Sequence, residues 1–178
     1  AGKSTLLKVL AGLSPATAGS VRTAPTPERI AYLGHATCLY PGLTALGNLA
    51  FWARMYGIGA RRNELMALLE RVGLEHAAEE RAQTFSRGMA QRLNLARVYM
   101  VRPELLFLDE PGTGLDPASL AALREDIRAL AGTGAAIAWV SHHVAEDAAL
   151  ADNALLLADR GMAYSGPAAG LPREAAAC

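Results

Sequence analysis

The most constraining feature of this chain is its first segment, Ala-Gly-Lys-Ser-Thr at residues 1–5, which the apolar pair Leu6-Leu7 follows at once. This segment matches the second half of the pattern G-x-x-x-x-G-K-[ST], in which backbone N–H groups at a helix start surround phosphate groups. The lysine of the pattern reaches phosphate oxygens, the Ser or Thr hydroxyl binds Mg²⁺, and the helix dipole adds positive potential there. We therefore expect nucleotide binding by Gly2, Lys3, Ser4 and Thr5. On this segment alone, an ordinary helix start preceded by glycine is the alternative.

The composition favours one domain and gives no sign of nucleic-acid binding. The chain has 178 residues, of which 52% are hydrophobic, and its 17 basic side chains balance 17 acidic ones. It can therefore bury a core, but it has no basic field that would recruit nucleic acid. No apolar run reaches the roughly 18–20 residues that a membrane helix needs. Cys38 and Cys178 lie far apart, which favours reduced thiols in a cytoplasmic protein over a disulfide or a metal site.

Short apolar runs alternate with helical patterns, which predicts an α/β fold with a parallel sheet. The expected strands, nearly continuous apolar runs suited to burial on both faces, are 30–33, 105–108 and 136–140. Helices are expected at residues 4–10 and 117–130. The Pro- and Gly-rich segment 13–29 reads as a loop, within which residues 19–23 could form a short strand.

A helical region interrupts this alternation. Between about residues 44 and 97, apolar side chains recur at helical spacing, with breaks at Gly57, Gly59 and Gly73. The predicted fold class is therefore α/β, with a P-loop NTPase-type parallel sheet and an inserted helical subdomain. We expect residues 1–178 to form one domain, with a helical lobe at about 44–97.

Two carboxylates, Asp109 and Glu110, follow the apolar run at 105–108. A buried strand would deliver them to the carboxyl edge of the sheet, where open α/β sheets bind their ligands. One carboxylate is expected to hold Mg²⁺ or its water, because Mg²⁺ prefers oxygen ligands that it shares with phosphates. The next can orient and polarise an attacking water. An ordinary acidic turn is the alternative.

A third segment, Phe-Ser-Arg-Gly-Met at residues 85–89, precedes another helical pattern. Ser86 and Gly88 would present a hydroxyl and backbone amides to an anion at the helix start. On this segment alone, a plain helix cap by Ser86 is the simpler interpretation.

The order of these segments resembles the ATP-binding cassette (ABC) ATPases that power membrane transporters, from residue 1 to about 166. After the phosphate loop come the signature-like segment 85–89, the strand ending in Asp109-Glu110, P-G-T-G-L-D-P at 111–117, and Ser141-His142. In that family two cassettes dimerise head to tail on permease subunits, and each ATP lies between one phosphate loop and the opposite signature segment. The resemblance implies ATP and Mg²⁺ as cofactors and a place on the cytoplasmic face of a bacterial inner membrane.

The resemblance also assigns roles within one subunit. Lys3 would neutralise charge on the β- and γ-phosphates, while Ser4 and Asp109 hold Mg²⁺. Glu110 would position the hydrolytic water. Catalysis would then depend on positioning and electrostatic stabilisation.

Further roles concern the dimer and the γ-phosphate. Ser86 and Gly88 would reach the γ-phosphate of the opposite subunit's ATP, and Asp116 would couple the two sites. His142 would contact the γ-phosphate and report its loss, with a structural histidine as the alternative; the neighbouring His143 is the weaker candidate.

The sequence departs from the family pattern in three places. His35 stands where a glutamine usually contacts Mg²⁺ and the attacking water; it could accept a hydrogen bond from water, face the transporter, or be a surface histidine. The signature reads F-S-R-G-M rather than the commoner L-S-G-G-Q. The first phosphate-loop glycine, an adenine-stacking aromatic and the N-terminal antiparallel strands are missing, so we expect a truncated cassette with weakened ATP binding.

Segments 33–35 and 43–52 are similar to the ATP-binding subunit of the haem exporter of cytochrome c maturation. We therefore expect an ATPase subunit for haem export, with no direct haem binding. Drug, polysaccharide or ion exporters remain alternatives, because their cassettes share the same motifs. A soluble ABC ATPase fits the length less well, and a nucleotide sensor without turnover would not need Asp109-Glu110.

Overall fold

The computed structural model describes residues 2–34, 36–142, 144–159 and 161–172. Within these ranges a three-stranded parallel sheet has the order β1-β2-β3. Its strands are β1 (Ile30–Leu33), β2 (Leu105–Asp109) and β3 (Ala136–Val140). The three predicted strands are therefore confirmed, with β2 longer by one residue, and the predicted α/β class with a parallel sheet is confirmed as well.

The strand register brings the ends of the strands to one edge. Leu33 of β1 lies opposite Leu108, and Asp109 lies opposite Val140 of β3. The residues that follow Leu33, Asp109 and Val140 are therefore neighbours in space, although the sequence separates them widely. This edge positions the candidate site.

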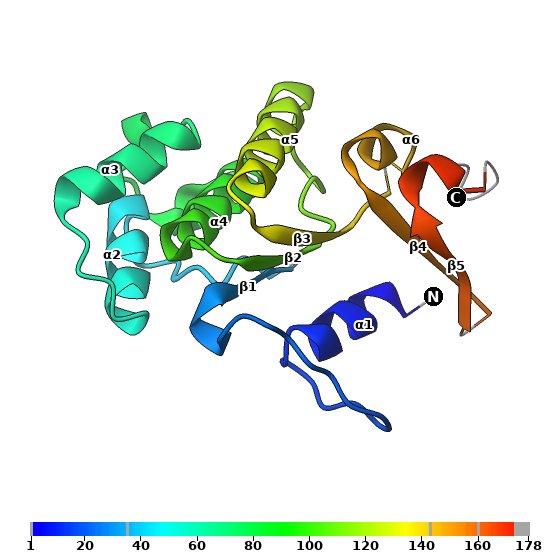
Figure 1. Cartoon of the computed structure of the whole chain (residues 1–178). Coiled ribbons are helices and arrows are strands. Elements are labelled where there is room, and N and C mark those ends of the chain that lie inside the picture. The colour runs from blue at the N-terminus through cyan, green and yellow to red at the C-terminus, as the bar shows by residue number, and fades with distance from the viewer. Residues whose placement is uncertain (1, 35, 143, 160, 173–178) are drawn as a thin grey trace.

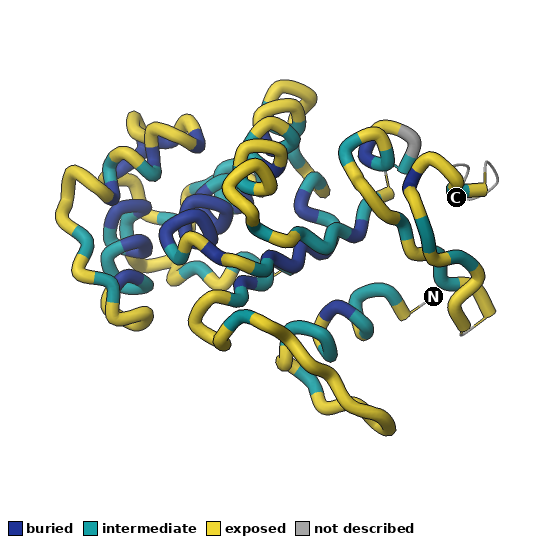
Figure 2. Tube along the Cα trace, in the orientation of Figure 1, coloured by how far each residue is buried: buried dark blue, intermediate teal, exposed yellow. Residues whose placement is uncertain are grey.

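Helices cover both faces of the sheet (Figure 1). On one face, Leu7 of α1 (Lys3–Leu10) packs with Phe107 and Val140. On the other, Leu106 and Leu108 join a larger core that includes side chains of α4 (Arg87–Val101) and α5 (Pro117–Gly132). Figure 2 shows many of the buried residues in the central strands and in α4. Alternation of apolar side chains across the strands accounts for these two layers.

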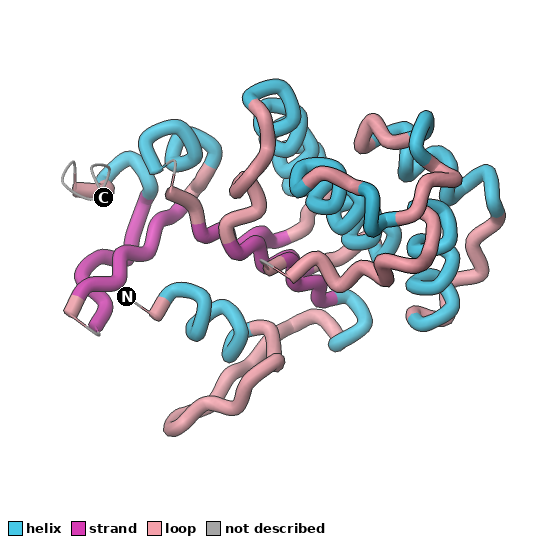
Figure 3. Tube along the Cα trace, turned by 180° about the vertical axis from the view of Figure 1, so that it is seen from behind, coloured by secondary structure: helices cyan, strands magenta, loops and turns pink. Residues whose placement is uncertain are grey.

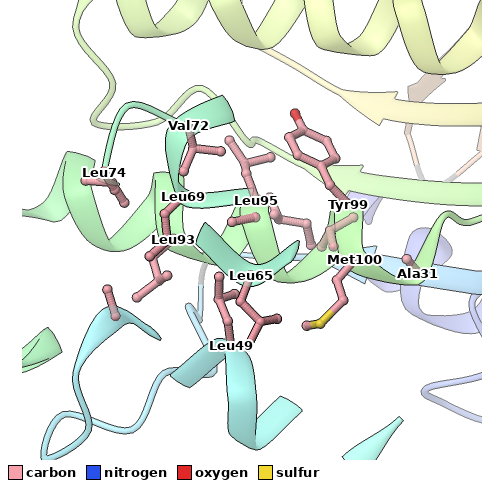
Figure 4. Packing of buried hydrophobic residues seen from close by; sticks show 14 of the residues in the cluster. Ala31, Leu49, Leu65, Leu69, Val72, Leu74, Leu93, Leu95, Tyr99 and Met100 are labelled. Carbon is pink, nitrogen blue, oxygen red and sulfur yellow. The ribbon is translucent and has the colours of Figure 1, made fainter. Parts of the chain in front are cut away.

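The helical region contains α2 (Ala45–Met55), α3 (Arg62–Arg71) and α4, with short 3₁₀ turns at Glu75–Ala77 and Ala82–Thr84. Its apolar side chains belong to the same core as the strands. Figure 4 shows Leu49, Leu65 and Leu93, from the three helices, gathered in one cluster. The predicted break lies between α2 and α3, where Gly57 has a left-handed φ of 67°.

The remaining elements are α6 (Val144–Asp147), a 3₁₀ turn at Ala148–Leu150, and an antiparallel hairpin of β4 (Asn153–Ala158) and β5 (Gly161–Pro167). A last 3₁₀ turn spans Ala168–Gly170, and one at Pro27–Arg29 precedes β1. Figure 3 shows the hairpin as a separate pair of strands. The sequence analysis did not anticipate this hairpin.

The strand considered at residues 19–23 is not formed, which corrects that expectation. The segment is exposed, and no described strand lies beside it to exchange backbone hydrogen bonds. A strand without a neighbour leaves its N–H and C=O groups unpaired, so this stretch stays an open loop between α1 and β1. In the described ranges, no helix is long and apolar enough to cross a membrane.

Candidate functional site

The carboxylate of Asp109 stands at the centre of the site. It ends the buried strand β2 and is only 1% exposed. The Ser4 hydroxyl donates to its Oδ1 at 2.9 Å, and the Tyr32 hydroxyl donates to its Oδ2 at 2.9 Å. The structure therefore brings together Ser4 and Asp109, which the sequence analysis paired, and adds Tyr32.

Tyr32 was missed by the sequence analysis. It lies in β1, opposite Phe107, and its hydroxyl reaches the end of the neighbouring strand. Burial, and then the hydrogen bond to Asp109, raise the pKa of Tyr32 to about 12. The hydroxyl therefore keeps its proton to a higher pH than an ordinary tyrosine does. The sequence signal that could have identified Tyr32 is its hydroxyl group, which lies within the otherwise apolar strand β1.

The donor set fits Mg²⁺. A hydroxyl and a carboxylate lie within hydrogen-bonding distance of each other, and both are oxygen ligands of the kind that Mg²⁺ prefers. Among the described residues, no group of three or more His, Cys, Asp or Glu could hold a metal ion. Mg²⁺ commonly takes its other ligands from water and from substrate phosphates, so two protein ligands are enough for it.

The start of α1 fits an anion. Gly2 precedes the helix with a left-handed φ of 85°, and no side chain caps the helix start. The first N–H groups of a helix have no partner within the helix, and its dipole is positive there. Lys3 is partly buried and Thr5 is exposed at this end. Phosphate oxygens would satisfy these N–H groups next to Ser4.

Glu110 and His142 form the second pair of the site. His142 Nε2 lies 2.6 Å from Glu110 Oε1, and their side chains are 61% and 18% exposed. The Glu110 N–H donates to Val140 O at 2.9 Å, and Glu110 takes a left-handed φ of 54°, unusual for a residue with a side chain. The strained backbone turns the chain away from the sheet just after Asp109, which suits a functional position.

A small cavity of about 30 Å³ adjoins this pair. The described residues that line it are Glu110, Gly112, Thr113, Leu120, Trp139, Ser141, His142 and Asp147. Among the described residues, the buried indole N–H of Trp139 has no hydrogen-bond partner. The cavity is large enough for about one water molecule.

The signature-like segment begins α4. Ser86 is the N-cap, and its Oγ accepts a hydrogen bond from the Met89 N–H at 3.2 Å. The interpretation of Ser86 as a helix cap is therefore confirmed. Ser86 is exposed, so its hydroxyl is also accessible from outside. No hydrogen bond or ion pair within the described ranges joins Ser86 or Gly88 to Ser4 or Asp109.

The segment after Glu110 packs against the start of α4. Gln91, a buried side chain, donates to Pro111 O at 3.1 Å. A Cβ atom on Gly88 would lie 3.4 Å from Gly114 O. The backbones therefore approach closely at Gly88, so the signature-like segment and the loop containing Asp116 form one surface.

Asp116 caps α5. Its Oδ1 accepts from Ser119 N–H at 3.0 Å and its Oδ2 from the Ser119 hydroxyl at 2.6 Å. These bonds to Ser119 hold the pKa of Asp116 below its usual value. Asp116 is exposed, so its carboxylate lies at the surface that the start of α4 shares.

The remaining histidines and cysteines of the sequence analysis are not part of this site as described. His35, His143 and Cys178 fall outside the described residues, so their predicted states stay predictions. Cys38 is an exposed free thiol, and its S–H faces Ala36 O at 3.7 Å.

Comparisons with known proteins agree with this geometry. A family model described as "ABC transporter" matches residues 1–113. The linearmycin resistance ATP-binding protein LnrL of Bacillus subtilis is 37% identical over 163 residues, which are 85% of this chain and 52% of that protein. The cytochrome c biogenesis ATP-binding export protein CcmA of Cereibacter sphaeroides is 40% identical over 141 residues, which are 79% and 64% of the two chains. The chain thus spans about half to two thirds of these relatives.

A solved structure also matches. The chain superposes on an ATP-binding subunit of an ABC transporter with a TM-score of 0.85 and 27% identity. The match covers 93% of this chain and 74% of that one.

Proposed function

This chain belongs to the ABC transporter family, and we propose that it is the ATP-binding and ATP-hydrolysing subunit of an export complex. One observation carries this proposal: Asp109, which accepts from Ser4, and Glu110, which contacts His142, are consecutive residues at one sheet edge. Phosphoryl transfer to water needs ligands for a cation, here Ser4 and Asp109, and a carboxylate that positions the water, here Glu110. Residues 1–178 would act as one nucleotide-binding domain with its helical lobe at about 44–97.

Each residue has a role in binding the substrate. Gly2, Thr5 and the amides at the start of α1 surround the phosphates, and Lys3 neutralises their charge. Ser4 and Asp109 hold Mg²⁺, which when bound neutralises charge on the phosphate oxygens. Tyr32 orients Asp109 through the hydrogen bond to Oδ2.

Hydrolysis then requires a positioned water. Glu110 accepts a hydrogen bond from the water and takes its proton as the water oxygen bonds to the γ-phosphorus. The bond from that phosphorus to the β–γ bridging oxygen breaks, which leaves ADP and inorganic phosphate. His142 contacts the γ-phosphate and, through Glu110, responds to its departure.

We further propose that two copies enclose the nucleotides. Ser86, Gly88 and Asp116 lie on one surface, and the N-terminus of α4 there suits an anion from a second copy. His35 would act at the same site. Glu110→Gln protein should dimerise when ATP is added, a doubling of mass that light scattering detects, because bound ATP is not consumed.

The complex would lie on the cytoplasmic face of the inner membrane with permease subunits, and haem for c-type cytochromes is the cargo that we propose. The 40% identity to CcmA supports haem export. The 37% identity to LnrL, over more of this chain, favours antibiotic export as the second candidate. ATP hydrolysis by the complex purified with its membrane partner should rise with haem in the first case and with linearmycin in the second.

A matched pair of lysines tests the ATPase proposal. Lys3→Ala should weaken ATP binding by roughly tenfold or more, because a charge-assisted contact is lost. Lys8→Ala removes the same group from the exposed side of the same helix and should change nothing. Titration of the protein, expressed from its complete reading frame, with a fluorescent ATP analogue measures both. Equal affinities would contradict the proposal.

A further inference from the structure

Asp147 is a buried carboxylate that the proposed mechanism does not use. Its side chain, at the end of α6, is 6% exposed. Both oxygens are occupied: Oδ1 accepts from Arg124 Nε at 2.7 Å, and Oδ2 accepts from the Ser141 hydroxyl. Burial of a carboxylate is unfavourable unless it is paired and hydrogen-bonded. The contacts with Arg124 and Ser141 meet both conditions for Asp147.

Arg124 holds the carboxylate from α5. Its Nε donates to Asp147, while its Nη2 donates to Glu146 Oε2 at 2.6 Å. The hydrogen bond to Glu146, and next the one to Asp147, raise the pKa of Arg124. The planar guanidinium thus joins α5 to two successive residues of α6 in one orientation.

These contacts anchor the backbone that carries His142. Val140 O accepts from Glu110 N–H, and the next residue, Ser141, is tied to Asp147. The His142 side chain is 61% exposed, so packing around its ring contributes little to its position. The 2.6 Å contact between His142 and Glu110 therefore depends on the anchored backbone at 140–141.

We propose that Asp147, held by Arg124, is a positioning residue that fixes Ser141 so that His142 meets Glu110. The proposal rests on the proposed function, because that function gives the His142–Glu110 pair its role on ATP. Asp147 itself lines the cavity beside this pair and touches neither reacting group in the contacts described above.

The chain offers a control on α5, the helix that carries Arg124. Asp126 of α5 accepts two hydrogen bonds from Arg71, at 3.0 and 2.7 Å. This ion pair has the same chemistry as that of Asp147, but it leads to α3 and not to the segment of His142. Asp126→Asn therefore reports the effect of losing an Arg–Asp pair on stability alone.

The experiment compares Asp147→Asn with Asp126→Asn in the protein from its complete reading frame. We expect Asp147→Asn to lower kcat for ATP roughly 10- to 100-fold with KM changed less than about twofold, because misplacement of a catalytic group affects turnover. Asp126→Asn should keep kcat while its thermal midpoint falls. In ¹⁵N-histidine NMR spectra without nucleotide, the His142 resonances should shift in Asp147→Asn and not in Asp126→Asn.

Equal kcat values and unshifted His142 resonances in the two variants would overturn the proposal. If Asp147→Asn does not fold, Ser141→Ala, which removes the hydroxyl that donates to Asp147, should produce the same resonance shift; an unchanged spectrum there would also overturn it. Should the unmodified protein fail to hydrolyse ATP, the proposed function fails. The resonance shift would then still test the positioning role.

Discussion

The hydroxyl of Ser4 donates a 2.9 Å hydrogen bond to Oδ1 of Asp109, a residue 105 positions further along the chain. This bond joins the first turn of α1 to the end of β2. It places one hydroxyl and one carboxylate where both can bind the same cation. The metal dependence of nucleotide binding is the property that this pair should control.

Ser4→Ala should weaken metal binding in the nucleotide complex. Without the hydroxyl, Asp109 alone remains for Mg²⁺, and we expect metal affinity in the nucleotide complex to fall by roughly tenfold or more. Titration of the ATP complex with Mn²⁺, followed by electron paramagnetic resonance, measures this. Ser20→Ala, in the exposed loop before β1, is the control. Identical Mn²⁺ affinities of the two variants would contradict the assignment.

Tyr32 should make the metal-free protein sensitive to alkali. Its pKa is about 12 in the folded protein, above the ordinary value of 10.0, so the folded state retains the proton longer than the unfolded state does. The associated stability is complete below pH 10.0 and is lost as pH rises toward 12. Urea unfolding at pH 9 and pH 11 should show a smaller loss in Tyr32→Phe than in the unmodified protein. Tyr40→Phe, at an exposed tyrosine, should keep the full loss.

Asn48 should stabilise the helical region more than any exposed amide does. Its side chain is fully buried, donates to the carbonyls of Tyr40, Leu43 and Thr44, and accepts from Tyr40 N–H at 2.7 Å. Asn48→Ala leaves these backbone groups without their partner, which costs about 2–4 kcal/mol of unfolding free energy. Asn63→Ala, on the surface of α3, should cost less than about 0.5 kcal/mol. Equal urea midpoints would refute this role.

Local patterns accounted for much of the fold. β1 and β3 have the predicted bounds, because continuous apolar runs between loop residues define buried strands. The start of α5 at Pro117 was predicted from helical spacing, and the structure adds that Asp116 caps this helix. Residues 19–23 show the limit of such patterns, because a strand also needs a neighbour.

The site was predictable where its residues follow a strand or start a helix. Ser4 and Asp109 were paired because the resemblance to ABC ATPases gives both residues a role at Mg²⁺. Tyr32 and Asp147 were missed because their partners depend on strand register and on which face of α5 meets α6. No local pattern encodes such contacts between distant segments.

The most direct test of the account is ATP hydrolysis by Glu110→Gln, measured together with ATP binding in the protein from its complete reading frame. Glu104→Gln, at an exposed residue just before the same strand, is the control. The account predicts unchanged ATP affinity and a fall in kcat of roughly 10²-fold or more in Glu110→Gln, with normal turnover in Glu104→Gln. Undiminished turnover in Glu110→Gln would contradict the claim that this site hydrolyses ATP through Glu110.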